Sequence, residues 1–429
     1  MAEPARAQPR KPVAVAKPAV VLKPAKAAAK EEAGPVVAYA GATVHLGNGE
    51  VIQDATVVIA NGKITQLGKG LAAPGGATLL PAKGMVITPG LVDALTSIGL
   101  IEVDLESSTR SDHQLAVSND SVHAGFRAAD AYNPASTVIA VARSEGLTSA
   151  GVIPTGGLIS GQSAWVDLDG ATAEEAIAQA PLALHVHLDS DAAGDGAGHG
   201  TAILKVREAF DDARTFQKSK AAWERNQTRR FAPSRLDLEA LASALDQKLP
   251  VVFHVDRAAD ILAVLNLARE FKLRPVIAGG AEAWKVAPQL AAAKVPVFLF
   301  PLQQPSSFDA LGAREDNAAL LDKAGVAVGI STGETHNARK LRQEAGNAVR
   351  SGLPYEAALA AITRVPAEAL GLGARYGTLA VGKTANLVVW SGDPLEIGTQ
   401  VLDLVIRGHR LPLRSRQTAL LDRYRRLPR

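Results

Sequence analysis

Two β-rich ends flank a long segment that alternates short apolar runs with helical patterns, and this arrangement constrains the fold more than any other feature. At the first end, Asn61-Gly62 separates two apolar runs in "VVIANGKITQLG". Both residues tolerate the positive φ of a tight turn, so the pattern predicts a β-hairpin. At the other end, "GTLAVGKTANLVVWSGD" and "VLDLVIRGH" again predict short strands with glycine turns. We therefore expect one β-sandwich built from residues 36–89 and 377–412.

The segment between these ends, residues 90–376, predicts a parallel (β/α)8 barrel. Its apolar runs predict strands at 90–95, 148–153, 164–168, 181–188, 250–255, 274–278, 295–300 and 326–330. Helical patterns lie between most of these runs, as at 258–271 and 281–293. Alternating strands and helices favour a parallel sheet, and about 250 residues is usual for eight such units. No dinucleotide-binding glycine loop follows the first strand, which disfavours a doubly wound sheet. The sequence thus predicts an α/β protein: a TIM-like barrel with a small β-sandwich domain.

The two termini differ from the rest of the chain in composition. Residues 1–35 alternate Ala, Pro and Lys and cannot bury enough apolar surface to order the backbone, so we expect a disordered tail. Residues 413–429 are rich in arginine, and we expect a basic helix or tail there. As written, the chain carries no signal peptide, which favours the cytoplasm; a trimmed signal peptide would place it in the periplasm or outside the cell.

The net charge and the amino-acid composition exclude several classes of function. The formal net charge of the 429 residues is only +3, which gives no footprint for nucleic acid. The chain has no cysteine, so thiol catalysis, disulfides and cysteine-ligated zinc are excluded. No apolar run approaches the roughly 20 residues of a membrane helix.

Four stretches, in order along residues 36–410, resemble the amidohydrolase superfamily. The first two are "GKITQLGKG" and "MVITPGLVDALTSIGL", and the second of these contains the first barrel strand. The others are "GLPYEAALAAITRVPAEALGL" and "YGTLAVGKTANLVVWSGDP". Within the superfamily, the chain looks closest to imidazolonepropionase-like and dihydroorotase-like enzymes. The resemblance implies a TIM-like barrel, a β-sandwich formed by both chain ends, and hydrolysis of C–N bonds other than peptide bonds.

The family performs metal-assisted hydrolysis. Its ligands are a His-x-His pair on strand 1, often Lys or Glu on strand 4, His on strands 5 and 6, and Asp on strand 8. A zinc-type site lowers the pKa of bound water from about 15.7 to about 7, which supplies hydroxide at neutral pH. The strand-8 Asp normally takes the proton from that water.

This chain keeps one histidine of that set, His254 on strand 5. The other aligned positions carry residues unlike the family's ligands: Leu95, Ser97, Gly279, and Gly333 or, one residue earlier, Thr332. A divalent site needs at least three protein ligands to stay loaded. We therefore expect no metal at the family positions and no cofactor, and we expect His254 to form a hydrogen bond at the barrel mouth.

A second His-x-His offers a relocated site. His185 and His187 lie two residues apart on the predicted fourth strand, so both imidazoles face the same side. If that side is the barrel mouth, they would join His254, with Asp189 or Asp191, around zinc or another divalent ion. The alternative is a polar strand end beside the glycine-rich loop "AAGDGAGHG".

Two further segments border the predicted mouth. "STGETHNAR" brings Glu334, His336 and Arg339 after strand 8, either as acid–base or carboxylate-binding groups or as the cap of the next helix. "IPTGGLISGQSAW" has no lysine after its glycines, so it predicts a tight loop beside a ligand and not a phosphate loop.

Three hypotheses follow for function. The first is an amidohydrolase homologue with a degenerate metal site that binds a small molecule at the barrel mouth or partners an active paralogue. The second is an active hydrolase with metal at His185, His187 and His254. The third is a structural barrel that serves as an interaction surface. Homo-oligomerisation stays open in all three, and no nucleic-acid or membrane partner is expected.

Overall fold

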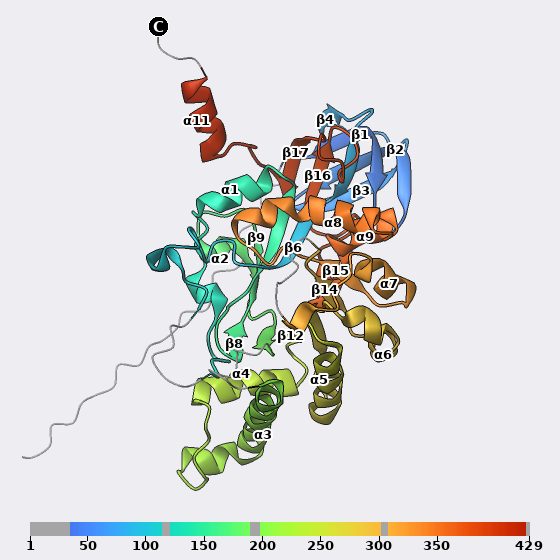
Figure 1. Cartoon of the computed structure of the whole chain (residues 1–429). Helices are drawn as coiled ribbons and strands as arrows, with labels where there is room; N and C mark the ends of the chain where they lie inside the picture. Colours follow the sequence, from blue (N-terminus) through green and yellow to red (C-terminus); the bar gives the residue numbers. More distant parts are fainter. Residues whose placement is uncertain (1–34, 114–120, 189–197, 302–307, 426–429) are drawn as a thin grey trace, which may run out of the picture. The chain divides into compact units, whose positions relative to one another are not determined.

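The computed structural model describes residues 35–113, 121–188, 198–301 and 308–425. Most of the expected N-terminal tail, and Asp189 and Asp191, lie outside these ranges. The described chain is a mixed α/β fold in which strands from both ends meet in one sheet (Figure 1). No described helix combines the length and the apolar character that crossing a membrane requires.

The largest sheet has eight strands. Its members are β1 (Val37–His45), β2 (Val51–Ala60), β3 (Lys63–Lys69), β4 (Thr78–Pro81), β5 (Val86–Pro89), β16 (Leu387–Trp390), β17 (Val401–Ile406) and β18 (His409–Arg410). β5 pairs antiparallel with β16, which joins the two chain ends. The hairpin of β2 and β3 turns at Asn61 and Gly62, whose φ angles of 50° and 73° fit the predicted tight turn.

Two smaller sheets lie in the segment between the ends. The four-stranded sheet contains β6 (Leu91–Thr96), β7 (Leu147–Val152), β9 (Ala164–Asp167) and β10 (Ile177–Gln179). The six-stranded sheet contains β8 (Ile159–Gln162), β11 (Leu184–His187), β12 (Val251–Val255), β13 (Pro275–Gly279), β14 (Val297–Leu299) and β15 (Val328–Ile330). β11 to β15 are mutually parallel, as expected for βα units.

Two features differ from an all-parallel barrel. β9 runs antiparallel to β7, and β8 runs antiparallel to β11. Backbone hydrogen bonds between Ser163 and the 182–183 segment connect the two sheets on this side. On the other side, Leu95 N–H donates to the Ser331 hydroxyl at 3.0 Å. The contacts between β6 and the end of β15 pass through side chains such as Ser331. In the described chain, no backbone ladder pairs β6 with β15, so a closed eight-stranded barrel stays a prediction.

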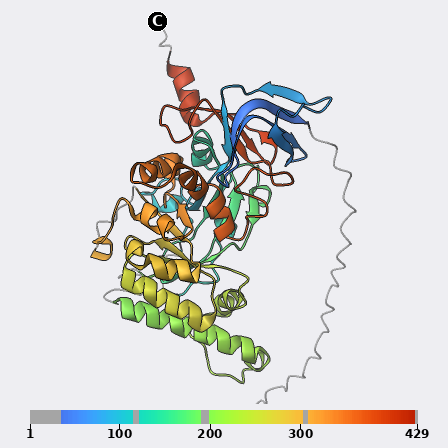
Figure 2. The same cartoon turned by 90° about the vertical axis from the view of Figure 1, so that its right-hand side faces the viewer.

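Helices surround these sheets. They are α1 (Thr137–Arg143), α2 (Ala173–Ala176), α3 (His199–Glu224), α4 (Arg235–Leu245), α5 (Ala258–Phe271), α6 (Ala287–Ala293), α7 (Asn317–Lys323), α8 (Leu341–Arg350), α9 (Tyr355–Ala361), α10 (Arg364–Ala369) and α11 (Arg416–Tyr424), with short 3-10 turns η1 (Ser107–Thr109), η2 (Ala128–Ala131), η3 (Ala283–Val286), η4 (Phe308–Ala310) and η5 (His336–Lys340). α3, α4 and α5 lie together at the end far from β1–β3 (Figures 1 and 2).

Alternation along the strands separates two apolar cores. On β12, Phe253 packs in the large core that also contains α5 residues such as Ile261. Its neighbour Val252 packs in a smaller core with Leu95 and Phe298. Successive side chains of a strand point to opposite faces. The smaller core therefore lies on the face of β12 opposite α5, where Ala367 of α10 also packs, and His254 lies on that same face, two residues after Val252.

Candidate functional site

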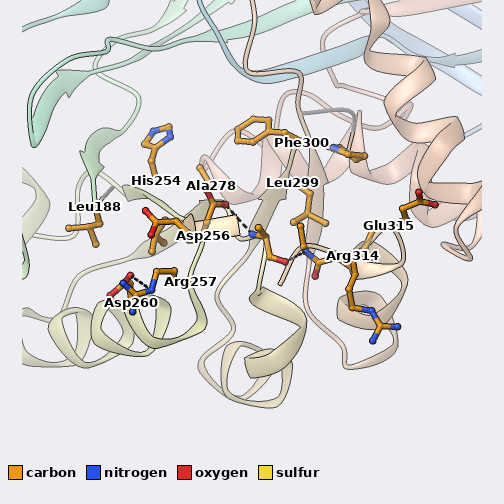
Figure 3. Close-up of a pocket in the computed structure, with 18 of the residues that line it drawn as sticks. Leu188, His254, Asp256, Arg257, Asp260, Ala278, Leu299, Phe300, Arg314 and Glu315 are labelled. Atoms are coloured by element: carbon orange, nitrogen blue, oxygen red, sulfur yellow. Dashed lines mark hydrogen bonds and ion pairs between the residues drawn. The ribbon is translucent and has the colours of Figure 1, made fainter. Parts of the chain in front are cut away.

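A cavity of about 580 Å3 opens at the carboxyl ends of β12, β13 and β14. Val255, Gly279 and Leu299 are the last residues of these strands, and each lines the cavity. The first residues of α5 and α7 complete the wall (Figure 3). Loops at this end of parallel strands carry the ligand-binding residues of βα folds. The cavity is therefore the candidate functional site.

The cavity wall combines an apolar side with a charged side. His254, Ala278, Leu299 and Phe300 are placed along the strand ends in Figure 3, with charged side chains toward the helices. Five carboxylates but only two guanidinium groups line the cavity. The carboxylates are Asp256, Asp260, Asp309, Glu315 and Glu334, and the guanidinium groups are those of Arg257 and Arg314. Both guanidinium groups are near acidic partners, Arg257 at 3.6 Å from Asp260 and Arg314 at 2.7 Å from Asp316. The wall therefore disfavours an anion.

His185, His187 and His254 lie together at the ends of β11 and β12. His187 pairs with His254 in the parallel register. Their rings stack at 4.1 Å between centroids, with 9° between planes. Nδ1 of His185 lies 3.0 Å from Nε2 of His254, within hydrogen-bond distance. The structure therefore brings together the three histidines that the sequence proposed as a group.

The hydrogen bonding of the cluster fits neutral imidazoles. Burial, together with the neighbouring His187, lowers the pKa of His185 to about 3. Burial likewise places the pKa of His254 well below its usual value. One of the two nitrogens joined at 3.0 Å must donate and the other accept, which neutral rings of complementary tautomers provide. At neutral pH, this pair therefore carries no charge toward the cavity.

Ser160, in the glycine-rich stretch after β7, holds the third ring. Its hydroxyl oxygen lies 3.1 Å from Nε2 of His187 and 3.2 Å from the carbonyl oxygen of Pro154. When the hydroxyl donates to that carbonyl, it accepts from the N–H of His187. The stretch predicted as a tight loop beside a ligand thus includes β8, which positions the histidine cluster.

The histidine geometry does not fit a shared metal ion. A metal lies in the plane of each imidazole that binds it, about 2.0–2.1 Å from the nitrogen for zinc. The stacked rings of His187 and His254 have separate, nearly parallel planes, so one ion cannot lie in both. Nε2 of His185 is buried and has no partner among the described residues, but the nitrogen that faces His254 already has one. Among the described residues, no three or more His, Asp or Glu side chains are grouped so that they could hold a metal.

The family's strand-1 positions lie in a different environment. Leu95 is 1% exposed and packs in the smaller apolar core. Ser97 follows it and is also buried. Beneath them, Asp93 is fully buried at the junction of β6 and β15. Its carboxylate accepts from the hydroxyls of Ser331 and Thr332, and from the backbone N–H groups of Leu95 and Thr332.

Burial has the largest effect on the pKa of the Asp93 carboxyl group. It raises the pKa to about 6, although the donors from Ser331, Thr332 and Leu95 act in the opposite direction. Burial disfavours the charged form and hydrogen bonds favour it, so here the loss of solvent exceeds the gain from four donors. Thr332, the alternative strand-8 ligand position, already donates to this carboxylate and does not point to a separate site.

Gly279 and Gly333, which the sequence analysis aligned with ligand positions of the family, have backbone angles that disfavour side chains. Gly279 has φ +90°, and a Cβ there would lie 2.7 Å from Oδ1 of Asp256. Gly333 has φ +66°. Non-glycine residues rarely adopt such angles, because Cβ approaches the backbone. A larger residue at either position would therefore strain the backbone.

The segment after strand 8 divides between the cavity and the surface. Glu334 lines the cavity and accepts from Nδ2 of Asn337 at 2.5 Å. His336 and Arg339 lie in η5, are exposed, and are not among the residues that line the cavity. The structure thus brings Glu334 alone of these three to the candidate site.

Sequence reasoning missed His199, the first residue of α3. Its Nδ1 lies 3.0 Å from Asp260, and its Nε2 lies 3.2 Å from Asp309. These carboxylates come from α5 and η4, so the imidazole links three elements at the cavity wall. Burial raises the pKa of Asp260, although His199 opposes this shift. The only sequence signal was a histidine in the glycine-rich loop "AAGDGAGHG", and neither partner is near it in the sequence.

Comparisons with known proteins agree with this architecture. A family model described as "Amidohydrolase family" matches residues 322–411. The crystal structure of an amidohydrolase from Thermotoga maritima MSB8 is 27% identical, covers 88% of this chain and 100% of its own, and has a TM-score of 0.80. A zinc-bound adenosine deaminase from Xanthomonas campestris is 19% identical over 91% of this chain and 97% of its own, with a TM-score of 0.53, which indicates a shared fold.

One curated relative matches over most of the chain. Amidohydrolase tasK of Hapsidospora irregularis is 24% identical over 388 residues, which is 82% of this chain and 39% of that protein. The chain therefore spans about two fifths of the length of this relative. The shared region includes the candidate site but leaves most of the relative unmatched.

Proposed function

The chain belongs to the amidohydrolase superfamily, whose members typically depend on a metal ion, and from this premise we propose that it is a homologue with a degenerate metal site that binds a small ligand. The observation that carries the proposal is that the remaining polar groups bind one another. The histidines hydrogen-bond and stack, and Asp93 accepts four donors at the opposite junction. On this proposal, the closed barrel of the family holds the ligand at its mouth.

The cavity supports a neutral or cationic ligand with an apolar part. Its strand side offers Leu299 and Phe300, and its helix side offers a surplus of carboxylates. A volume of about 580 Å3 lies within the range of small-molecule sites. Binding would leave the histidine cluster neutral at the cavity wall.

Measurement of the bound metal directly tests whether the metal site is degenerate. Protein purified without chelators is expected to contain clearly less than one zinc per chain after dialysis against trace zinc. It is also expected not to hydrolyse cyclic amides faster than the uncatalysed reaction. Stoichiometric zinc that is retained through dialysis, together with turnover, would contradict the proposal.

Ligand binding needs a separate experiment. Pentylamine and pentylguanidine are expected to raise the melting temperature in a saturable way, whereas pentanoate at the same ionic strength is not. Asp309→Asn should weaken the amine effect, because it removes one wall carboxylate. Glu208→Gln removes the same charge outside the cavity and serves as the control. If none of the three compounds binds, the structural-barrel hypothesis is favoured.

A second candidate is supported by one observation. Nε2 of His185 is buried without a partner among the described residues, as a nitrogen awaiting a metal would be. An active hydrolase with a relocated ion would require the stacked rings to separate. If His185→Ala abolishes both bound metal and turnover, this candidate replaces the degenerate one.

A further inference from the structure

A second pocket, separate from the candidate site, lies where α1, the segment after β9 and the start of α11 come together. Its volume is about 330 Å3. α1 and α11 are neighbours in both views (Figures 1 and 2). Three guanidinium groups line it: Arg143, Arg414 and Arg416. We propose that this pocket is a binding site for a small oxyanion, a phosphate or carboxylate group.

The basic groups of the pocket are only partly neutralised. Arg416 has no ion pair or hydrogen bond of its side chain among the described residues, and it is exposed. Arg414 pairs with Asp422 at 3.0 Å on the surface. The single carboxylate in the lining, Asp169, is already engaged by Arg407 at 3.5 Å and by His409 at 3.2 Å. The pocket therefore keeps a net positive field.

Two buried donors in the same wall are without partners. The hydroxyl of Tyr132 and Nε of Arg143 are shielded from solvent and have no hydrogen-bond partner among the described residues. Tyr132 as a whole is 6% exposed. A buried donor left unpaired destabilises the fold, and a ligand that supplies an acceptor removes that cost. An oxyanion supplies acceptors of the required sign, and arginine binds phosphate and carboxylate through paired N–H donors.

The start of α11 adds to the same field. Ser415 caps this nine-residue helix by accepting from the N–H of Thr418. Helix N-termini carry partial positive charge and backbone donors that favour anions. Two carboxylates lie behind the wall. Glu102 accepts three hydrogen bonds from Ser136 and Thr137. Asp167, whose charge acts on Tyr132, accepts from Ser149, Asn386 and Tyr376. The attraction from the arginines and the helix therefore exceeds this local repulsion.

The inference is tested by calorimetric titration of the full chain with inorganic phosphate and, separately, with citrate. Sodium chloride at matched ionic strength measures the nonspecific effect. Saturable binding of either anion beyond that effect is expected, and the tighter of the two identifies the oxyanion. Absence of saturable binding for both anions would overturn the proposal.

Variants locate the binding. Arg143→Gln is expected to weaken the anion about tenfold or more, as loss of a charge-assisted contact implies. Arg416→Gln changes an exposed side chain and so keeps the fold, and it should weaken binding about threefold to tenfold. Tyr132→Phe should also weaken binding while keeping the charge. Arg230→Gln removes an exposed arginine outside this pocket. If it weakens binding as much as Arg416→Gln does, the effect is general electrostatics and the site is disproved.

Discussion

The two polar clusters beside the candidate site differ in how burial acts on them. At β11 and β12, burial keeps His185 and His254 neutral by lowering their pKa values. At the β6–β15 junction, burial raises the pKa of Asp93 to about 6, yet hydrogen bonds from Ser331, Thr332 and Leu95 still favour its carboxylate. We call the first cluster (His185, His187 and His254) the histidine wall and the second (Asp93, Ser331 and Thr332) the aspartate wall. In a metal centre, both would direct ligands at one ion. Here the groups of each wall bind one another, apart from Nε2 of His185. Burial lowers the pKa values of the histidines and raises that of Asp93, so it has opposite consequences for the pH dependence of stability.

The largest expected effect comes from emptying the Asp93 junction. Asp93→Ala leaves the hydroxyl and the backbone N–H of Thr332 buried without their acceptor, whereas the Ser331 hydroxyl can still donate to the carbonyl oxygen of Leu95 at 3.0 Å. We expect the free energy of unfolding to fall by about 2–5 kcal/mol, because at least two buried donors lose their acceptor at about 1–3 kcal/mol each. Urea unfolding at pH 7 measures the loss.

Asp93→Asn is the matched control, because it keeps the size and one acceptor oxygen. It should cost clearly less than the alanine variant. Equal losses in both variants would mean that one neutral acceptor oxygen does not satisfy these donors, and the expected stabilisation of the junction by hydrogen bonds to an uncharged side chain would be wrong.

Because of the histidine wall, the free energy of unfolding of the protein should fall as the pH falls. The folded pKa of His185 is lowered to about 3 from an ordinary 6.5, so the unfolded chain binds the proton more readily. Its contribution is complete above pH 6.5 and declines below that value. Between pH 7 and pH 5, the wild type should lose about 2 kcal/mol relative to His185→Gln. Parallel pH profiles of the two proteins would contradict the neutral, buried imidazole.

The aspartate wall should show the reverse trend. The folded pKa of Asp93 is raised from 3.8 to about 6, so the folded chain binds the proton more readily in this range. Its contribution is complete below pH 3.8 and is lost as the pH rises through 6. From pH 4 to pH 7, the wild type should lose about 2 kcal/mol relative to Asp93→Asn. A difference of the opposite sign would show that the hydrogen bonds exceed the effect of burial.

The smallest expected effect is on metal content. If the histidine wall is self-contained, His254→Ala should leave the zinc content unchanged within error, although it removes the partner of His185. Elemental analysis of both proteins, prepared side by side, checks this. A fall in zinc in the variant would show that the histidines and a metal share one site, and the contrast between the walls would become a contrast between a metal site and a structural junction.

Local patterns in the sequence determined much of the fold. The Asn61-Gly62 turn, the strands of the central segment and the bounds of α5 at Ala258–Phe271 follow from turn chemistry and apolar periodicity, which depend on near neighbours. The direction of β8 and β9 does not, because alternation is the same in parallel and antiparallel strands. The prediction that Leu95 and Gly279 stand at ligand positions of the family rests on residue identity alone and stays a prediction.

Only the tertiary structure decided what the remaining polar groups do. The partners His185 and His254 are 69 residues apart, and Ser331 is 238 residues from Asp93. The sequence placed these side chains on strands, but their partners depend on strand order and register. The same holds for His199, whose two carboxylates come from α5 and η4. Residue identity decided which side chains the strands carry. Burial and long-range contacts, which no local pattern encodes, decided which of these side chains bind one another.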